Sequence, residues 1–206
     1  MKATFKYILI VVVISVILII LSVFLLLQRH TACQLSSREV KVLETKANNG
    51  DIDAAWELYG CFEEDDKQSI HWLEVGAMAG DPRAKYNLYS ILENRGDQNS
   101  VLYLLDAASH DYTLAQRELA KLYISGKYWQ KDVTAAKYWL YRASDNEDNI
   151  AMYDLAKLLT SQFGSKMEAC SLAQKSLRTV NKNSGAIEKG SALYLEITRF
   201  IEDNCK

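Results

Sequence analysis

Proline occurs once and glycine nine times in the 206 residues, which excludes collagen-like chains and most disordered or all-β chains. Histidine occurs three times, and no two histidines have the i, i+4 spacing of a helical zinc site. The sequence has no glycine-rich phosphate-binding loop and no G-x-S-x-G nucleophile elbow. These absences argue against an enzyme, a resident metal or cofactor, and a small-molecule substrate.

Basic residues are scarce outside the N-terminus. The chain has 24 Lys and Arg against 26 Asp and Glu, but Lys2, Lys6 and Arg29 precede His30 and no acidic residue does. The remainder therefore carries about five net negative charges, whereas nucleic-acid-binding proteins present a basic surface to the phosphates. The sequence predicts no nucleic-acid partner.

One long apolar run lies near the start of the chain. Residues 8–27 read ILIVVVISVILIILSVFLLL, and a helix of this length matches the hydrocarbon core of a bilayer, about 30 Å. We therefore expect residues 1–29 to be an uncleaved signal anchor. Lys2 and Lys6 precede the run, so the positive-inside rule places the N-terminus in the cytoplasm and the rest of the chain across the membrane.

An alternative for this segment is a lipoprotein signal. Thr31-Ala32-Cys33 resembles the end of the motif that leads to lipidation of a cysteine, here Cys33. His30, however, stands where that motif has an aliphatic residue. The signal anchor is the interpretation adopted.

The chain has four cysteines, and all of them follow the apolar run: Cys33, Cys61, Cys170 and Cys205. No two have CxxC spacing, and an even number in a translocated body is typical of two disulfides, for which three connectivities are open. We expect Cys33–Cys61 and Cys170–Cys205, because each pair would close a local helical hairpin. Buried free thiols are the alternative.

A repeat of about 30 residues occupies the middle of the chain. Four alanines, each followed four residues later by leucine, recur at spacings of 30, 31 and 36 residues: Ala54–Leu58, Ala84–Leu88, Ala115–Leu119 and Ala151–Leu155. A third apolar residue follows at +7. Because offsets 0, +4 and +7 share one face of a helix, each block predicts a first helix with an apolar stripe.

The second half of each block predicts a second helix. A large aromatic residue is followed by two small ones, which let neighbouring helices approach while the ring fills the space between them: Trp72, Tyr103 and Trp139. Aspartates before the first helices predict their N-caps: Asp51, Asp81 and Asp111. Two such helices cannot bury their apolar faces alone, so stacking must supply the core.

These patterns predict an all-α fold, an α-solenoid of antiparallel helix pairs behind an N-terminal transmembrane helix. Residues 30–46 are expected to form a linker and a leading helix, and residues 47–160 the repeats. The pattern lapses after Ser161. Residues 161–206 are expected to form two capping helices, at about 166–180 and 186–202.

The repeats resemble the Sel-one-like repeats, relatives of the tetratricopeptide repeats. Their unit runs A-x-x-x-L-x-x-L-Y-x-x-G, a loop, D-x-x-x-A-x-x-W, and A-A-x-x-G. The third block matches nearly all of it, with Ala115, Leu119, Leu122, Tyr123, Gly126, Asp132, Ala136, Trp139 and Ala143. The resemblance covers residues 47–160 and implies an α-solenoid that binds other proteins.

The resemblance also implies that the first helices line a concave surface. Position +2 from each alanine points away from the apolar stripe and holds residue types enriched at interface hot spots. Together with acidic residues at +3, these positions predict a partner-binding groove of Trp56, Glu57, Tyr86, Arg117, Glu118 and Tyr153. The alternative is that Trp56 and Tyr86 pack between neighbouring first helices.

A function follows only by analogy with the family. Small bacterial proteins that look like this one, with an anchor and a few Sel-one-like repeats, are often immunity proteins. They neutralise a toxic effector, such as a lipase delivered by type VI secretion. We therefore expect a single-pass inner-membrane protein whose periplasmic repeats occlude a toxin. The alternatives are an envelope scaffold or regulator, a hydrolase such as a beta-lactamase, and an adaptor of the endoplasmic reticulum lumen.

Overall fold

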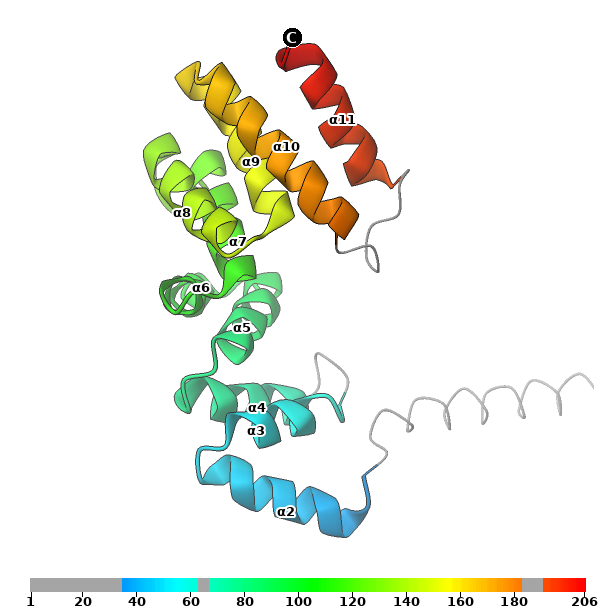
Figure 1. The fold of residues 1–206 in the computed structure, drawn as a ribbon. Coiled ribbons are helices and arrows are strands. Elements are labelled where there is room, and N and C mark those ends of the chain that lie inside the picture. Colours follow the sequence, from blue (N-terminus) through cyan, green and yellow to red (C-terminus); the bar gives the residue numbers. More distant parts are fainter. Residues whose placement is uncertain (1–34, 63–66, 183–190) are drawn as a thin grey trace, which may run out of the picture. The chain divides into compact units, whose positions relative to one another are not determined.

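The structure is a computed structural model, and it describes residues 35–62, 67–182 and 191–206. Within these ranges the chain forms helices and no strand (Figure 1). It divides into two compact units, the first ending at Ala79 and the second beginning at Gly80. The predicted transmembrane run, residues 8–27, lies outside the described residues. No helix within them is both long enough and apolar enough to cross a membrane.

The first unit contains α2 (Ser37–Asn48), α3 (Ile52–Tyr59) and α4 (Lys67–Met78). The leading helix α2 starts with a capping box, in which Ser36 and Glu39 each bond the other's backbone N–H. Asp51 caps α3, as the sequence predicts, by accepting hydrogen bonds from the amides of Asp53 and Ala54 at 3.1 Å. The core of this unit is formed by small residues, a leucine and a tryptophan: Ala47, Ala54, Ala55, Leu58 and Trp72.

The second unit contains α5 (Pro82–Asn94), α6 (Ser100–Ser109), α7 (Thr113–Ser125), α8 (Val133–Asp145), α9 (Asn149–Leu158), α10 (Lys166–Lys182) and α11 (Ala192–Asn204). A π-helical turn, η1 (Leu159–Phe163), continues α9. The helices pack as the pairs α5/α6, α7/α8 and α9/α10, and α11 covers α10. The sequence predicts α10 and α11 as two capping helices; in the structure α10 packs against α9, and α11 packs against α10.

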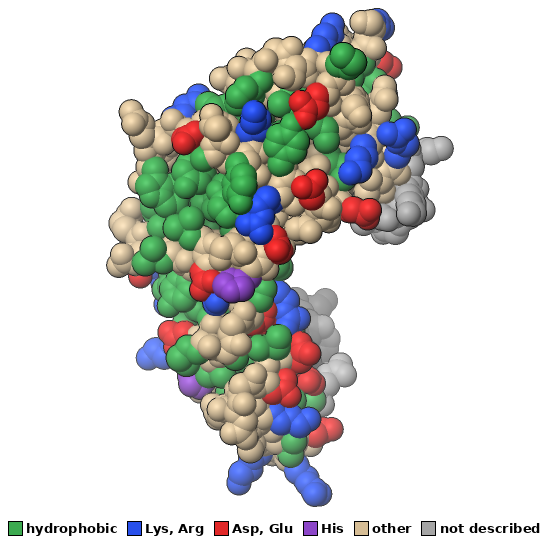
Figure 2. All heavy atoms as spheres, turned by 60° about the vertical axis from the view of Figure 1, so that its left-hand side comes forward, with side chains coloured by type: hydrophobic (Ala, Val, Ile, Leu, Met, Phe, Trp, Pro, Cys, Tyr) green, Lys and Arg blue, Asp and Glu red, His purple; other side chains and the backbone are tan. Residues whose placement is uncertain are grey.

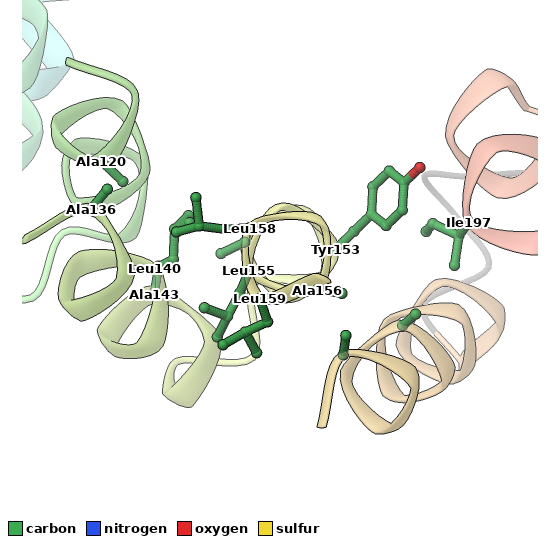
Figure 3. Packing of buried hydrophobic residues seen from close by; sticks show 13 residues of the cluster. Ala120, Ala136, Leu140, Ala143, Tyr153, Leu155, Ala156, Leu158, Leu159 and Ile197 are labelled. Carbon is green, nitrogen blue, oxygen red and sulfur yellow. The ribbon is translucent and has the colours of Figure 1, made fainter. Parts of the chain in front are cut away.

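The leucine stripe forms the core, as the repeat predicts. The leucines at +4 are at most 1% exposed in every first helix: Leu58, Leu88, Leu119 and Leu155. In Figure 3, Leu155 and Leu158 of α9 lie beside Leu140 of α8, whereas Tyr153 points the other way, toward Ile197 of α11. One cluster therefore draws side chains from α7 through α11, and burial is shared between pairs rather than confined to each.

The small residues of the second helices are buried as expected, but one aromatic residue is not. Ala107, Ala108 and Ala143 are fully buried, and Trp72 is 5% exposed. Tyr103, predicted to fill the space between helices, is instead 36% exposed. The cluster around α6 contains Leu104 and Val101, so the apolar stripe of α6 is turned away from Tyr103.

The turn before each first helix has one backbone feature in all four blocks. The residue four positions before the repeat alanine has a positive φ: 92° at Gly50, 98° at Gly80, and 60° at both Asp111 and Glu147. The prediction that Asp111 is an N-cap is therefore wrong. Asp111 takes the place of the turn glycine, and Tyr112 is the N-cap of α7.

The left-handed turn residues give a first testable prediction. Glu147→Gly should raise the free energy of unfolding by about 0.5 kcal/mol, because glycine relieves a strain of about 1–2 kcal/mol at some cost in chain entropy. Asp111→Gly should instead be destabilising, because the Asp111 carboxylate accepts a hydrogen bond from Gln116 at 3.1 Å and pairs with Arg142. Urea titrations of the two variants would measure both effects, and equal signs would contradict this account.

The structure joins Cys170 and Cys205 by a disulfide, with a Cα–Cα distance of 5.6 Å. This is one of the two pairings expected, and it ties the end of α11 to the start of α10. Cys61 is also disulfide-bonded. Its expected partner, Cys33, lies outside the described residues.

The disulfide gives a second prediction. It closes a separation of 35 residues, so chain entropy assigns it about 3–4 kcal/mol. Replacing Cys170 and Cys205 by Ser should make the amides of α11 exchange with deuterium at least about tenfold faster, since one tenfold step needs only 1.4 kcal/mol. The amides of α5 in the same variant are the internal control. Unchanged exchange in α11 would mean that packing alone holds it.

Candidate functional site

The predicted groove residues of the second unit lie between neighbouring first helices. Position +2 contacts the start of the next first helix from α5 and α7, and contacts α11 from α9. The three contacts are Tyr86 with Tyr112, Arg117 with Asp148, and Tyr153 with Phe200. For Tyr86, the contact is the one that the alternative interpretation expects, packing between neighbouring first helices.

Tyr86 is half-buried and belongs to a group of three tyrosines. Its ring centroid lies 5.4 Å from that of Tyr112 and 6.4 Å from that of Tyr89. Burial raises the pKa of Tyr86 above its ordinary value, and it does the same for the pKa of Tyr112. Both phenols therefore stay neutral across the physiological range and act as packing groups.

Arg117 forms an ion pair across the stack. One of its guanidinium nitrogens lies 2.9 Å from the Asp148 carboxylate, and the side chains are 17% and 9% exposed. Asp148 is also the N-cap of α9 and accepts a hydrogen bond from the Ala151 amide at 2.9 Å. Glu118, one position further on, pairs with Lys121 at 3.0 Å toward the surface.

Tyr153 differs most from the prediction, because it is only 6% exposed. Its ring meets that of Phe200 edge-to-face, with 5.7 Å between centroids, and the Lys157 ammonium lies 4.5 Å from its centroid. Burial raises the pKa of Tyr153. Because α11 covers this position, the Tyr153 side chain is part of the packing between α9 and α11.

Trp56 and Glu57 lie in the first unit. Trp56 is half-buried, and its ring centroid is 5.2 Å from that of Tyr59. Glu57 is exposed and lines a hollow of about 290 Å³ beside α2, together with Leu35, Arg38 and Val42. Two of the predicted groove residues carry carboxylates, Glu57 and Glu118. The Glu57 side chain is exposed and the Glu118 side chain is partly exposed, so solvent reaches both.

A groove of about 270 Å³ opens on the first-helix surface of the second unit, between α7 and α9. Its lining is Ala120, Lys121 and Ile124 from α7, Leu140 from α8, and Asp154, Lys157, Leu158 and Ser161 from α9 and its continuation. We call this the α7–α9 groove. It lies one turn further along the helices than the residues predicted from the sequence.

The α7–α9 groove combines an apolar floor with a charged rim. Ala120, Leu140 and Leu158 are buried at its base, while Ile124 is 37% exposed. On the rim, Lys157 pairs with Asp154 at 2.7 Å. Such a hollow can hold one apolar side chain of a partner while the rim forms hydrogen bonds and ion pairs. The described residues contain no group of three potential metal ligands.

Sequence reasoning missed this groove because it stopped at positions +2 and +3. Lys121 and Lys157 occupy +6 of their repeats, and Ile124 occupies +9. These offsets return to the same side of a helix as +2 after one and two further turns. Lysine at +6 in two successive blocks was therefore the sequence signal that could have predicted this groove.

Comparison with solved structures identifies the architecture. The chain is similar to a Sel1 repeat protein from Oxalobacter formigenes, with 22% identity and a TM-score of 0.62 over 79% of this chain and 49% of that one. It is also similar to a protective antigen present in uropathogenic Escherichia coli strains, which displays an SLR fold. There the identity is 20% and the TM-score 0.56, over 80% of this chain and 41% of that one. The fold is that of Sel-one-like repeats.

This chain thus spans about half the length of these two proteins or less. No protein-family model matches the sequence, and no curated protein matches it. The likeness therefore establishes how the helices are arranged.

The ion pair between Arg117 and Asp148 gives a third prediction. Arg117→Ala should lower the free energy of unfolding by about 2 kcal/mol, because it leaves the largely buried Asp148 carboxylate without its partner. Lys121→Ala is the matched control: it removes a pair that is 56% and 28% exposed, and should change stability by less than about 0.5 kcal/mol. Urea denaturation measures both. Equal losses would mean that Arg117 has no special role in the stack.

Proposed function

We propose that this protein binds one protein partner through the first-helix surface of its second unit, with the α7–α9 groove as the central contact. The groove is the observation that carries the proposal. Its floor is apolar, its rim holds two lysines and an aspartate, and its volume of about 270 Å³ suits a single large side chain. Interface hot spots are of this kind, a partly enclosed apolar hollow with a polar rim.

The role is one of binding and not of catalysis. The groove offers no nucleophile paired with a base: the Ser161 hydroxyl donates to the Leu158 carbonyl, and the Asp154 carboxylate pairs with Lys157. The polar groups of the rim thus form hydrogen bonds and ion pairs with groups of their own helix, which fixes their positions for contact with a partner. Chemical catalysis needs a nucleophile within hydrogen-bond reach of a base.

Within this proposal, the repeats lie in the periplasm and the N-terminal apolar run anchors them to the inner membrane. A tethered binder is present at high local concentration beside that membrane. This location would suit an immunity protein that occludes a toxic effector acting there, such as a lipase. The Cys170–Cys205 disulfide supports a location outside the reducing cytoplasm.

The experiment is a capture with matched variants. Detergent-solubilised full-length protein is used as bait, and the retained proteins are identified after a high-salt wash. Ile124→Arg should reduce the retained partner at least tenfold, because a charged side chain then fills the groove and loses about 1.4 kcal/mol or more of binding energy. Leu195→Arg, at a residue of α11 that is 56% exposed and outside the groove, should leave capture unchanged.

The identity of what is captured separates the roles. One stoichiometric protein whose toxic or hydrolytic activity is silenced in the complex would support the immunity role. A set of weakly held envelope proteins would favour the scaffold. A partner retained equally by wild type and Ile124→Arg would contradict the proposal that the α7–α9 groove is the binding site.

A further inference from the structure

A short segment of the second unit concentrates aromatic and cationic side chains. Of the 16 residues from Lys127 to Arg142, five are aromatic and four are Lys or Arg, and Asp132 alone is acidic. The Asp132 carboxylate is occupied as the N-cap of α8, accepting two backbone hydrogen bonds at 2.9 Å. The segment is therefore basic within a body that is acidic overall, and it holds two of the four tryptophans of the chain.

The fold brings three of these rings together, because Tyr128 and Trp129 of the loop between α7 and α8 pack with Trp139 of α8 on one apolar cluster. We define the aromatic face as Tyr128 and Trp129 of the loop and Tyr138 and Trp139 of α8. Tyr138 is 54% exposed, and the other three rings are half-buried. Figure 2 shows hydrophobic side chains gathered over this part of the unit, on the side brought forward in that view.

The rings of the loop are held in place. Trp129 stacks on Tyr123 with 5.0 Å between centroids, and the Tyr128 hydroxyl lies 3.4 Å from the Ser100 hydroxyl at the start of α6. Trp139 packs against the apolar cluster of α6. The aromatic face is thus a preformed surface and loses little conformational freedom when it is covered.

Cations lie among the rings. The Arg142 guanidinium is 5.4 Å from the Trp139 centroid, and the Lys127 ammonium is 5.7 Å from that of Tyr128. Both also have a carboxylate partner, Asp111 and Glu93 respectively. Lys131, in the same loop, is exposed and makes no ion pair within the described part of the chain.

We infer that the aromatic face lies against the headgroups of the bilayer that holds the N-terminal apolar run. Tyrosine and tryptophan concentrate at the boundary between lipid and water, and lysine and arginine are attracted to anionic lipids. The apolar run ends at Leu27, and the first described residue is Leu35. The eight steps from Leu27 to Leu35 span at most about 28 Å, so the first unit is tethered close to the membrane surface, and the second unit, which carries the aromatic face, is joined directly to the first at Gly80.

Contact with lipid through this surface would leave the α7–α9 groove free. The aromatic face belongs to the second helices and their loop, whereas the groove is lined mainly by the first helices α7 and α9. The contact with lipid and the contact with a partner thus use different residues of the unit. The inference rests on the anchoring part of the proposed function, and not on the identity of the partner.

The test uses the full-length protein reconstituted in vesicles of phosphatidylcholine with phosphatidylglycerol. Part of the phosphatidylcholine carries bromine near the carbonyl end of its acyl chains, where it quenches tryptophans at the interface. Roughly half of the emission should be quenchable, because two of four tryptophans lie on the aromatic face. The double variant Trp129→Phe/Trp139→Phe should lose this quenching, whereas Trp72→Phe, at a buried position, should keep it.

A second readout depends on charge. Replacing phosphatidylglycerol by phosphatidylcholine, or adding salt, should lower the quenching, since both weaken the attraction of the cations to the headgroups. Resistance of the reconstituted protein to alkaline extraction reports anchoring separately. An anchored protein without quenching, or with equal quenching in the double variant, would overturn the membrane-facing surface and leave the anchor intact. An extractable protein would overturn the anchor itself.

Discussion

A single pair of these helices cannot cover its own apolar stripe, and the rest of the described structure depends on that constraint. The leucine at +4 of each first helix is at most 1% exposed, and in the second unit one cluster reaches from α7 to α11. Truncating such a leucine to alanine typically costs about 2–5 kcal/mol, a large part of the stability of a small domain. The alanines allow this burial because they let the helix axes approach closely.

The same constraint explains what the sequence could predict. Offsets of 0, +4 and +7 specify which face of a first helix is buried, so the helix pairs and their core leucines follow directly from the repeat. The N-caps Asp51 and Asp81 follow too, because a carboxylate one residue before a helix satisfies free backbone amides. The N-cap prediction for Asp111 was wrong because Asp111 lies one residue before the N-cap of α7. It occupies the left-handed turn position, a backbone conformation that aspartate can adopt.

The helical periodicity of the sequence could not predict which neighbouring helix a residue at position +2 contacts. Position +2 points away from the apolar stripe of its own helix. The sequence therefore predicts an exposed side chain, as it would be in an isolated helix pair. In the stack, Arg117 reaches the cap of the next first helix and Tyr153 is covered by α11. The partners Asp148 and Phe200 are 31 and 47 residues away along the chain. Contacts of this kind depend on how one helix pair packs on the next helix pair, and the sequence of a single repeat block does not predict that packing.

The last described helix, α11, covers α10 and the Tyr153 side of α9. It buries Ile197 against α9 and α10 and turns charged residues such as Arg199 and Glu202 outward. On the first-helix surface of the second unit the α7–α9 groove combines a buried apolar floor with a charged rim, and in the proposed function it supplies a few well-enclosed contacts. Under that proposal, a site of this size favours one partner with a matching side chain over many partners held by extended contacts.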